Sequence, residues 1–334
     1  MILDLTMVWA AIIALAVLLY VMMDGFDLGI GILFPFIRRE EDRDVAVNTI
    51  APVWDGNETW LVLGGGGLFA VFPLAYSVLM TAFYAPLVVM LLALIFRGVA
   101  FEFRFRDPRH KAGWDMAFTG GSMVATFCQG VVLGAFIQDI DVEGRAYAGG
   151  WFDWLSLFSL FTGLSLVAGY ALLGAGWLVW RTEGNLQRLA LWLIRPALVA
   201  VLGAIGLVSV WTALLDAEIA ARWFSWPNIA YLSPVPLLVA VVALALLRAI
   251  RRRRDALPFL LSLCLFLLSY IGLGISLFPR IVPPHITIWQ AAAPPESQGF
   301  LLVGTLILLP VILAYTGYAY WVFRGKVRPG EGYH

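Results

Sequence analysis

Charged residues are scarce in this 334-residue sequence. Asp, Glu, Lys and Arg together make up 13% of it, whereas 61% of the residues are hydrophobic and the mean hydropathy is +0.87. A water-soluble domain of this length needs a polar surface, so the composition excludes that class and indicates a polytopic membrane protein. Basic and acidic residues balance at 22 each, so no excess of positive charge points to a nucleic acid partner.

Cysteine and histidine are also scarce. The two cysteines, Cys128 and Cys264, lie in apolar runs too far apart for a CxxC site, and we interpret them as unpaired packing residues. The three histidines, His110, His285 and His334, fall in predicted loops or in the tail. Haem needs axial His, Met or Cys ligands, and copper or iron sites need clusters of such residues. We therefore predict no bound haem, no metal and no catalytic residue in this chain.

The N-terminal segment lacks the basic start and the small-residue cleavage site of a signal peptide, so we predict a retained first helix. Met22 and Met23 lie inside this helix, where a lone methionine is more often a packing residue than a haem ligand. The glycine run at 64–67 is not a phosphate-binding loop, because no lysine follows it. It is more typical of close helix packing through small residues.

Nine apolar segments are long enough to cross a membrane, which takes roughly 20 residues as a helix. They cover residues 7–36, 54–74, 76–103, 115–137, 153–180, 191–214, 228–250, 256–278 and 298–323. A short turn near Pro73 joins the second segment to the third. No soluble domain or low-complexity linker interrupts the series, so we expect an all-α polytopic protein with one integral membrane domain over residues 1–334.

The basic residues support this count of nine, because they fall almost entirely on one set of alternating loops. One set of loops, with the C-terminus, has 18 basic residues, and the opposite set has 3. The larger set is Arg38, Arg39, Arg43, Arg104, Arg106, Arg109, Lys111, Arg181, Arg188, Arg195, Arg248, Arg251, Arg252, Arg253, Arg254, Arg324, Lys326 and Arg328. The positive-inside rule then predicts an external N-terminus and a cytoplasmic C-terminus.

Four acidic residues occupy predicted spans, where a charge is costly and usually faces a protein interior or a water-filled cavity. Asp24 and Asp27 are three residues apart and share one face of the first helix, and Asp55 and Glu58 are similarly spaced at the start of the second. About ten residues separate Asp27 from the cytoplasmic edge, which places it roughly 15 Å inside. Arg97 lies a turn or two inside the third helix, so we expect the three helices to gather these carboxylates around one guanidinium.

Two interpretations of these charges remain open. In the structural one, Asp55 caps the second helix, since acids favour helix N-termini, and Asp24 and Asp27 only neutralise Arg97. In the functional one, the carboxylates form a hydrated proton entrance from the cytoplasm, because carboxylates in partly dry sites exchange protons near neutral pH. The acidic segment "DIDVEG" at 139–144 is more typical of a solvated outer loop than of a cation site.

Several long motifs resemble subunit II of the cytochrome bd-type quinol oxidases. They are "MMDGFDLGIGIL", "NTIAPVWDGNETWLVLGGGGLFAVFPLAYS", "LIFRGVAFEFR" and "LFPRIVPPHITIWQAAAPPESQ". The resemblance covers essentially the whole chain. The short loops and "LVWRTEGNLQ" are more similar to the cyanide-insensitive branch of the family.

The resemblance implies a subunit of an inner-membrane respiratory heterodimer that reduces O₂ to water with electrons from quinol. The partner, subunit I, carries the quinol site and haem b, with haem d left open, while subunit II binds no haem. The implied fold has two four-helix bundles plus a peripheral helix. A small single-helix subunit, membrane lipids and a structural quinone or lipid are further partners that the resemblance leaves open.

The resemblance also implies roles for individual residues. Asp55 matches the family's WDGN aspartate, which belongs to a proton route from the cytoplasm toward the haems. Asp24 and Asp27 match its DGFD motif, and Arg97 matches its helix-three arginine. Gln290 departs from the family, which often has Asp there, so a role that needs charge at that position is in doubt.

The residues around these acids complete the hypothesis of a proton entrance. We expect Trp54 and Trp60 to anchor it at the membrane interface, and Gly64, Gly65, Gly66 and Gly67 to let the second helix pack against a neighbour or subunit I. The alternative is a proton-coupled secondary transporter, because such proteins also have acids near the membrane midplane. A transporter works alone, whereas an oxidase subunit is inactive without its haem-bearing partner.

Overall fold

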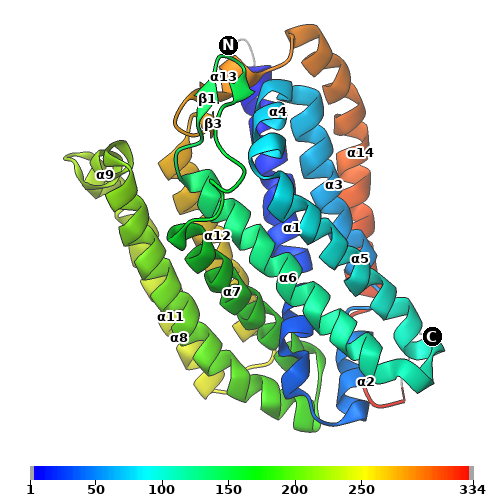
Figure 1. Ribbon diagram of the computed structural model, residues 1–334. Helices are drawn as coiled ribbons and strands as arrows, with labels where there is room; N and C mark the ends of the chain where they lie inside the picture. The colour runs from blue at the N-terminus through cyan, green and yellow to red at the C-terminus, as the bar shows by residue number, and fades with distance from the viewer. Residues whose placement is uncertain (1–3, 331–334) are drawn as a thin grey trace.

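The computed structural model describes residues 4–330, which are almost entirely helical (Figure 1). Two short hairpins, β1–β2 and β3–β4, lie in loops. The elements are α1 (Leu5–Leu33), η1 (Phe34–Phe36), α2 (Glu40–Asn48), α3 (Trp54–Val71), α4 (Pro73–Ala82), α5 (Tyr84–Arg106), η2 (Pro108–His110), α6 (Lys111–Ile137), β1 (Val142–Glu143), β2 (Ala146–Tyr147), α7 (Leu157–Arg181), α8 (Gly184–Leu215), α9 (Ala217–Phe224), α10 (Asn228–Leu232), α11 (Pro234–Arg251), α12 (Leu257–Leu277), β3 (Arg280–Val282), β4 (Ile286–Thr287), α13 (Ile288–Ala291) and α14 (Pro295–Val322).

Eight helical segments in the described part of the chain are long and apolar enough to cross a membrane. They correspond to eight of the nine expected segments, so the polytopic helical class is confirmed. The ninth segment, expected at 54–74, corresponds to α3. Its first turns contain Asp55, Asn57 and Glu58, and it is not one of these eight apolar segments. The count of nine and the division into two four-helix bundles plus a peripheral helix therefore stay predictions.

The joint between the second and third segments differs from the prediction. The expected short turn near Pro73 is instead a short helix, α4, and the third long helix begins at Tyr84 rather than at residue 76. The backbone leaves helical geometry at Phe72 and again at Phe83, and both rings are buried. Pro73 occupies the first turn of α4, where its missing N–H leaves no hydrogen bond unmade.

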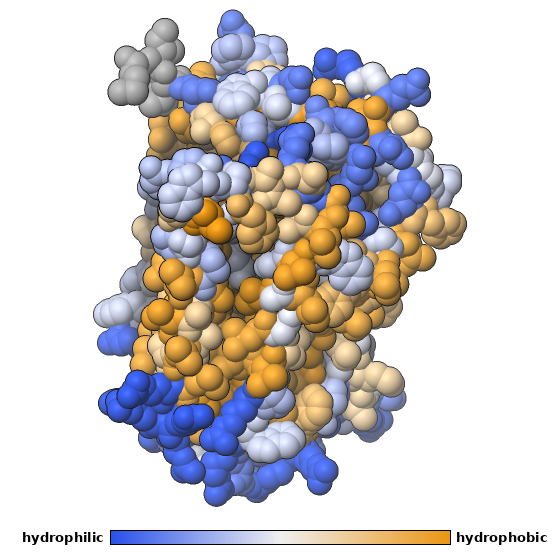
Figure 2. All heavy atoms as spheres, turned by 90° about the vertical axis from the view of Figure 1, so that its left-hand side faces the viewer, coloured by the Kyte–Doolittle hydropathy of each residue, from blue (hydrophilic) through white to orange (hydrophobic). Residues whose placement is uncertain are grey.

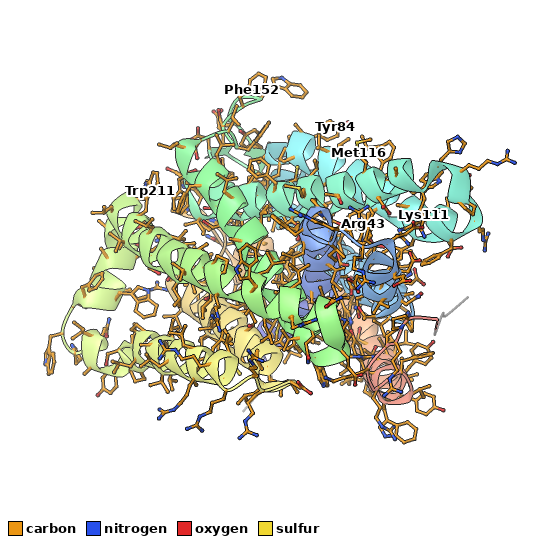
Figure 3. All side chains as sticks on the ribbon, turned by 90° about the horizontal axis from the view of Figure 1, so that it is seen from below. Arg43, Tyr84, Lys111, Met116, Phe152 and Trp211 are labelled. Atoms are coloured by element: carbon orange, nitrogen blue, oxygen red, sulfur yellow. The ribbon has the colours of Figure 1, made fainter. Side chains whose placement is uncertain are left out.

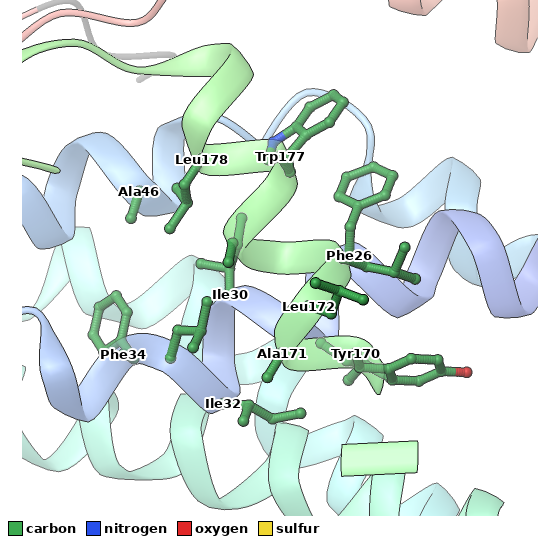
Figure 4. Packing of buried hydrophobic residues seen from close by; sticks show 14 of the residues in the cluster. Phe26, Ile30, Ile32, Phe34, Ala46, Tyr170, Ala171, Leu172, Trp177 and Leu178 are labelled. Atoms are coloured by element: carbon green, nitrogen blue, oxygen red, sulfur yellow. The ribbon is translucent and has the colours of Figure 1, made fainter. Parts of the chain in front are cut away.

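Helix α1 occupies the centre and packs against α3, α6 and α7 (Figure 1). Its contact with α7 is close, because a methyl group on Gly29 would collide with the backbone of Tyr170, and one on Gly174 would collide with Gly29. Figure 4 shows the side chains of this contact, where the Phe26 and Trp177 rings stack at 4.2 Å. Small residues therefore let helices pack tightly where no hydrophobic effect drives them together.

Apolar side chains cover the outside of the helices. Figure 2 shows a wide hydrophobic band between two more hydrophilic ends, with the strongest hydrophilic colour at one end. In α14, Gln298 is the only buried residue, and large side chains such as Phe300 and Tyr315 are exposed. This distribution is typical of a surface that contacts lipid or another membrane subunit.

Candidate functional site

Arg97 in α5 is the centre of a buried charge cluster. Its Nη2 atom lies 2.9 Å from Asp24 Oδ1 and 3.7 Å from Asp27 Oδ2, and its Nη1 atom lies 2.9 Å from Glu58 Oε1. Arg97, Asp24 and Asp27 are completely buried, whereas the Glu58 side chain is 25% exposed. The structure therefore brings together three of the four predicted carboxylates around the predicted guanidinium.

An amide and a phenol fix the carboxylate of Asp27. Asn57 in α3 donates from Nδ2 to Asp27 Oδ2 at 2.7 Å, and Tyr320 in α14 donates to Asn57 Oδ1 at 2.8 Å. The C-terminal end of α14 is in turn bound to α7, because Arg181 of α7 donates to the carbonyl of Phe323. The sequence analysis missed Asn57 and Tyr320, although both are polar residues inside apolar segments.

Asp55 lies outside the cluster. Its side chain is exposed, and among the residues that the structure describes none of opposite charge comes within ion-pair distance of it. The N-cap of α3 is Val53, and no side chain caps this end by a hydrogen bond. The hypothesis that Asp55 caps the helix is therefore wrong, although an acid in the first turn still interacts favourably with the helix dipole.

The exposure of the four predicted acids decreases from the surface to the interior of the cluster. Asp55 is at the surface, Glu58 lies one turn further along α3 and is partly exposed, and Asp24 and Asp27 lie inside. If every carboxyl of the cluster were ionised, three negative charges would face one positive charge. Burying uncompensated charge is expensive, so Arg97 alone does not balance these three acids in their ionised form.

The predicted tryptophans pack inside the protein. Trp60 is buried between α1 and α3 beside Ala16 and Tyr20. Trp54 stacks on Phe101 at 4.9 Å, and the Arg97 guanidinium lies 5.7 Å from its ring centre. The Trp54 ring therefore lies beside the cluster, and Trp60, which is buried, does not face the membrane interface as expected.

The four glycines at 64–67 divide between two faces of α3. A methyl group on Gly64 would contact Val17 of α1 at 3.4 Å, and one on Gly67 would contact Ile13 at 3.2 Å. Gly65 and Gly66 face outward, with open space where a methyl group would be. Two of the glycines thus serve the expected packing, within this chain and against α1.

A second group of charges lies at the end of the bundle that holds α2, and the sequence analysis missed it as a cluster (Figure 3, in which Arg43 and Lys111 are labelled). Arg104 is buried and donates to Asp115 and to Asp44, each at 2.6 Å. Arg43 donates to Asp115 at 2.9 Å, and Lys111 pairs with Asp44 at 3.0 Å. These bonds fix α2 to the α5–α6 hairpin, so we interpret this group as structural.

Two of the three histidines lie within the described residues. His110 and His285 are exposed in loops, and they pair with Asp107 at 2.8 Å and with Asp139 at 3.2 Å. The hydrogen bond with His110 lowers the pKa of Asp107 below its usual value. His334 lies outside the described residues. Within residues 4–330, no group of three or more His, Cys, Asp or Glu side chains has metal-binding geometry, and both cysteines are free.

The outer loops are tied together by hydrogen bonds. Thr287 caps the short helix α13, and Gln290 completes the cap by accepting from the backbone N–H of Thr287, which is a structural role that needs no charge. Trp289 donates from Nε1 to Asp4 at 2.9 Å and thereby lowers the pKa of that carboxyl. The predicted acidic loop at 139–144 contributes Asp139 to the ion pair with His285 and contains strand β1.

Comparison with known proteins identifies relatives over nearly the whole chain. The sequence model of the family "Cytochrome bd terminal oxidase subunit II" matches residues 5–323. The chain is similar to "Cytochrome bd ubiquinol oxidase subunit 2" of Bacillus subtilis, with 30% identity over 97% of each protein. It is also similar to "Cytochrome bd-I ubiquinol oxidase subunit 2" of Escherichia coli K12, with 28% identity over 96% of this chain and 94% of the relative.

A solved structure has the same fold. It is described as the structure of bd oxidase from Geobacillus thermodenitrificans, and one of its chains superposes with a TM-score of 0.78. The match covers 96% of this chain and 99% of that one, at 16% sequence identity. At this identity the match establishes the fold and carries no argument about individual residues.

Proposed function

Because this chain belongs to the cytochrome bd terminal oxidase subunit II family, we propose that it is the haem-free subunit of a quinol:O₂ oxidoreductase and supplies part of its cytoplasmic proton route. The family makes it a multi-pass subunit of a respiratory oxidoreductase in the bacterial inner membrane, with a subunit I as partner. Haem b, with haem d left open, and the quinol site belong to subunit I in this proposal. The alternative of a lone transporter has no support in the relatives.

The decreasing exposure from Asp55 through Glu58 to Asp24 and Asp27 is the observation that carries the proton route. A proton arriving at the surface meets Asp55 first, then Glu58, one turn away on α3. Arg97 contacts Glu58 and both buried acids. Protonation of one carboxyl therefore changes how tightly the other carboxyls bind their protons. Protons for O₂ reduction would pass from this cluster to subunit I.

The outward face of α3 is the surface that we assign to subunit I. It has an apolar hollow of about 390 Å³ lined by Thr59, Val62, Leu63, Gly66 and Gly67. Gly65 and Gly66 leave the backbone accessible for close packing of another helix. A small single-helix subunit, lipids and a structural quinone remain predictions from the family resemblance.

The purified chain without its partner is expected to show no Soret absorbance. Its two described histidines are exposed, ion-paired and in separate loops, so they do not provide an axial ligand inside the membrane. The measurement is an optical spectrum and a haem assay of the chain expressed alone, beside the complex co-purified with subunit I in mild detergent. Stoichiometric haem in the isolated chain would overturn the assignment of every haem to the partner.

Reporter fusions are expected to place the two ends of the bundle on opposite sides of the membrane. A reporter after Arg254, just past the end of α11, should be cytoplasmic because five arginines gather there. A reporter at Gly144, in the β1–β2 turn, should be external. An alkaline phosphatase and a green fluorescent protein fusion at each site give the measurement, and the same location for both sites would contradict the nine-span orientation.

A further inference from the structure

A polar stripe on α6 follows the acidic face of α1. Ser122, Thr126 and Gln129 are spaced by four and three residues, so they lie on one face of α6. At one end of the stripe, a methyl group on Gly31 of α1 would collide with the Ser122 side chain. At the other end, Gln129 donates to the hydroxyl of Tyr20 at 2.6 Å. Asp24 and Asp27 lie between Tyr20 and Gly31 along α1.

Two hydroxyl groups of this stripe have no partner in the described chain. Ser122 Oγ and Thr126 Oγ1 are completely buried and form no hydrogen bond, and the same is true of Asp27 Oδ1. A buried threonine in a helix usually bonds to the carbonyl four residues earlier, as Thr162 does to Phe158 at 2.8 Å in α7. A buried polar atom left unpaired is costly, so these atoms indicate a missing ligand.

Water is the ligand that matches the chemistry of these atoms. A buried water molecule makes about three hydrogen bonds to polar groups that otherwise have none. We propose that ordered water binds between α1 and α6, hydrogen-bonded to Ser122 and Thr126 on one side and to the Asp24–Asp27–Arg97 cluster on the other. The site takes water or a hydrated proton, because its groups include donors, acceptors and carboxyl oxygens within one seam.

The seam is closed toward the end that holds α2. Phe118 lies one turn before Ser122 on α6, and its ring contacts those of Phe34 and Phe101 edge-on, each at 5.1 Å. These three buried rings leave Glu58 as the partly exposed member of the cluster. The bound water is therefore an internal reservoir beside the carboxylates, reached from α3, and not a second channel from the α2 end.

The opposite end of the seam continues into a hydrogen-bond chain. Tyr170 donates to Gln129 Oε1 at 2.9 Å, and Gln129 donates to Tyr20. Because the Tyr20 hydroxyl accepts from Gln129, its own proton can be donated to another acceptor. Asp24 is the acid one turn further along the same face of α1. Gln129 and Tyr170 are thus positioning residues for Asp24. Their role in proton supply rests on the proposed function, whereas the water site rests on the geometry alone.

Radiolytic hydroxyl labelling of the assembled oxidase tests the water site, because X-rays generate radicals from bound water inside a protein. Tyr20 and Phe26 are both buried on α1, but Phe26 faces Trp177 and Phe259 in the apolar core. Tyr20 is expected to be labelled several-fold more than Phe26. The combined Ser122→Ala and Thr126→Val change should remove most of that excess. Equal labelling of the two rings, or labelling of Tyr20 that the double variant leaves unchanged, would overturn the proposal.

Thermal stability gives an independent measurement. If water bonds to Thr126, the isosteric Thr126→Val change removes a satisfied hydrogen bond, and the Tm of the complex should fall by about 2–4 °C. Thr162→Val is the matched reference, since it also removes a satisfied buried hydrogen bond, and it should lower the Tm by a similar amount. An unchanged or raised Tm for Thr126→Val would show a dry seam. Labelling as expected alongside normal turnover in a Glu58→Gln variant would keep the water site and refute the proton route.

Discussion

Replacement of Arg97 by methionine is expected to prevent assembly of the oxidase. Methionine nearly matches the arginine stem in shape but leaves Asp24, Asp27 and Glu58 without their shared positive charge. Removing one partner of a buried ion pair costs about 3–5 kcal/mol, and here one partner serves three acids. A loss of this size is a large part of the roughly 5–15 kcal/mol that holds a typical protein folded. The measurement is haem-containing complex recovered per milligram of membrane protein.

Arg106→Met is the matched control, because Arg106 lies on the same helix but is exposed, with its partner Glu102 also at the surface. It should assemble normally, since exposed ion pairs contribute about 0–1 kcal/mol. Arg97→Lys keeps the charge but loses the fork that contacts several carboxylates, so its yield should be intermediate. Normal yield of Arg97→Met would contradict a charged cluster and would mean that its carboxyls are held neutral.

The sequence predicted this cluster because helical spacing is a strong constraint. Asp24 and Asp27 must share a face of one helix, and an arginine buried in a neighbouring helix of a membrane protein needs acidic partners. Asn57, Tyr320 and Gln129 were missed because an amide or a phenol is tolerated at many places in a membrane helix. Only the packing of α3, α14 and α6 around α1 shows which of them meet the acids.

The rotation of α3 could not be predicted from the spacing of its two acids. Asn57 and Trp60 are buried toward α1, and this choice of face turns Asp55 to the surface while Glu58 reaches Arg97. The buried group around Arg104 was missed for a related reason. Its basic members were counted as loop charges that set the topology, because sequence alone does not show that α2 folds back onto the α5–α6 hairpin.

Glu58→Gln is expected to slow quinol-driven O₂ uptake by about tenfold, which corresponds to roughly 1.4 kcal/mol on the barrier. The substitution keeps the size of the side chain and an oxygen that can accept from Arg97 Nη1, but it removes the titratable group between the surface and the buried acids. Haem content should remain near that of the unmodified complex. The measurement is O₂ uptake normalised to haem, and loss of haem instead would indicate a charge pair needed only for assembly.

Asp55→Asn separates a surface role from a role inside the cluster. Asp55 is exposed and no ion pair fixes it among the described residues, so the change should leave assembly intact. We expect a smaller decrease in turnover than for Glu58→Gln, because water around an exposed residue can deliver protons directly to Glu58. A decrease for Asp55→Asn that exceeds the one for Glu58→Gln would mean that protons enter through Asp55 into subunit I and bypass Arg97. Full turnover in both variants would remove the proton route from this subunit and leave the cluster as a structural element.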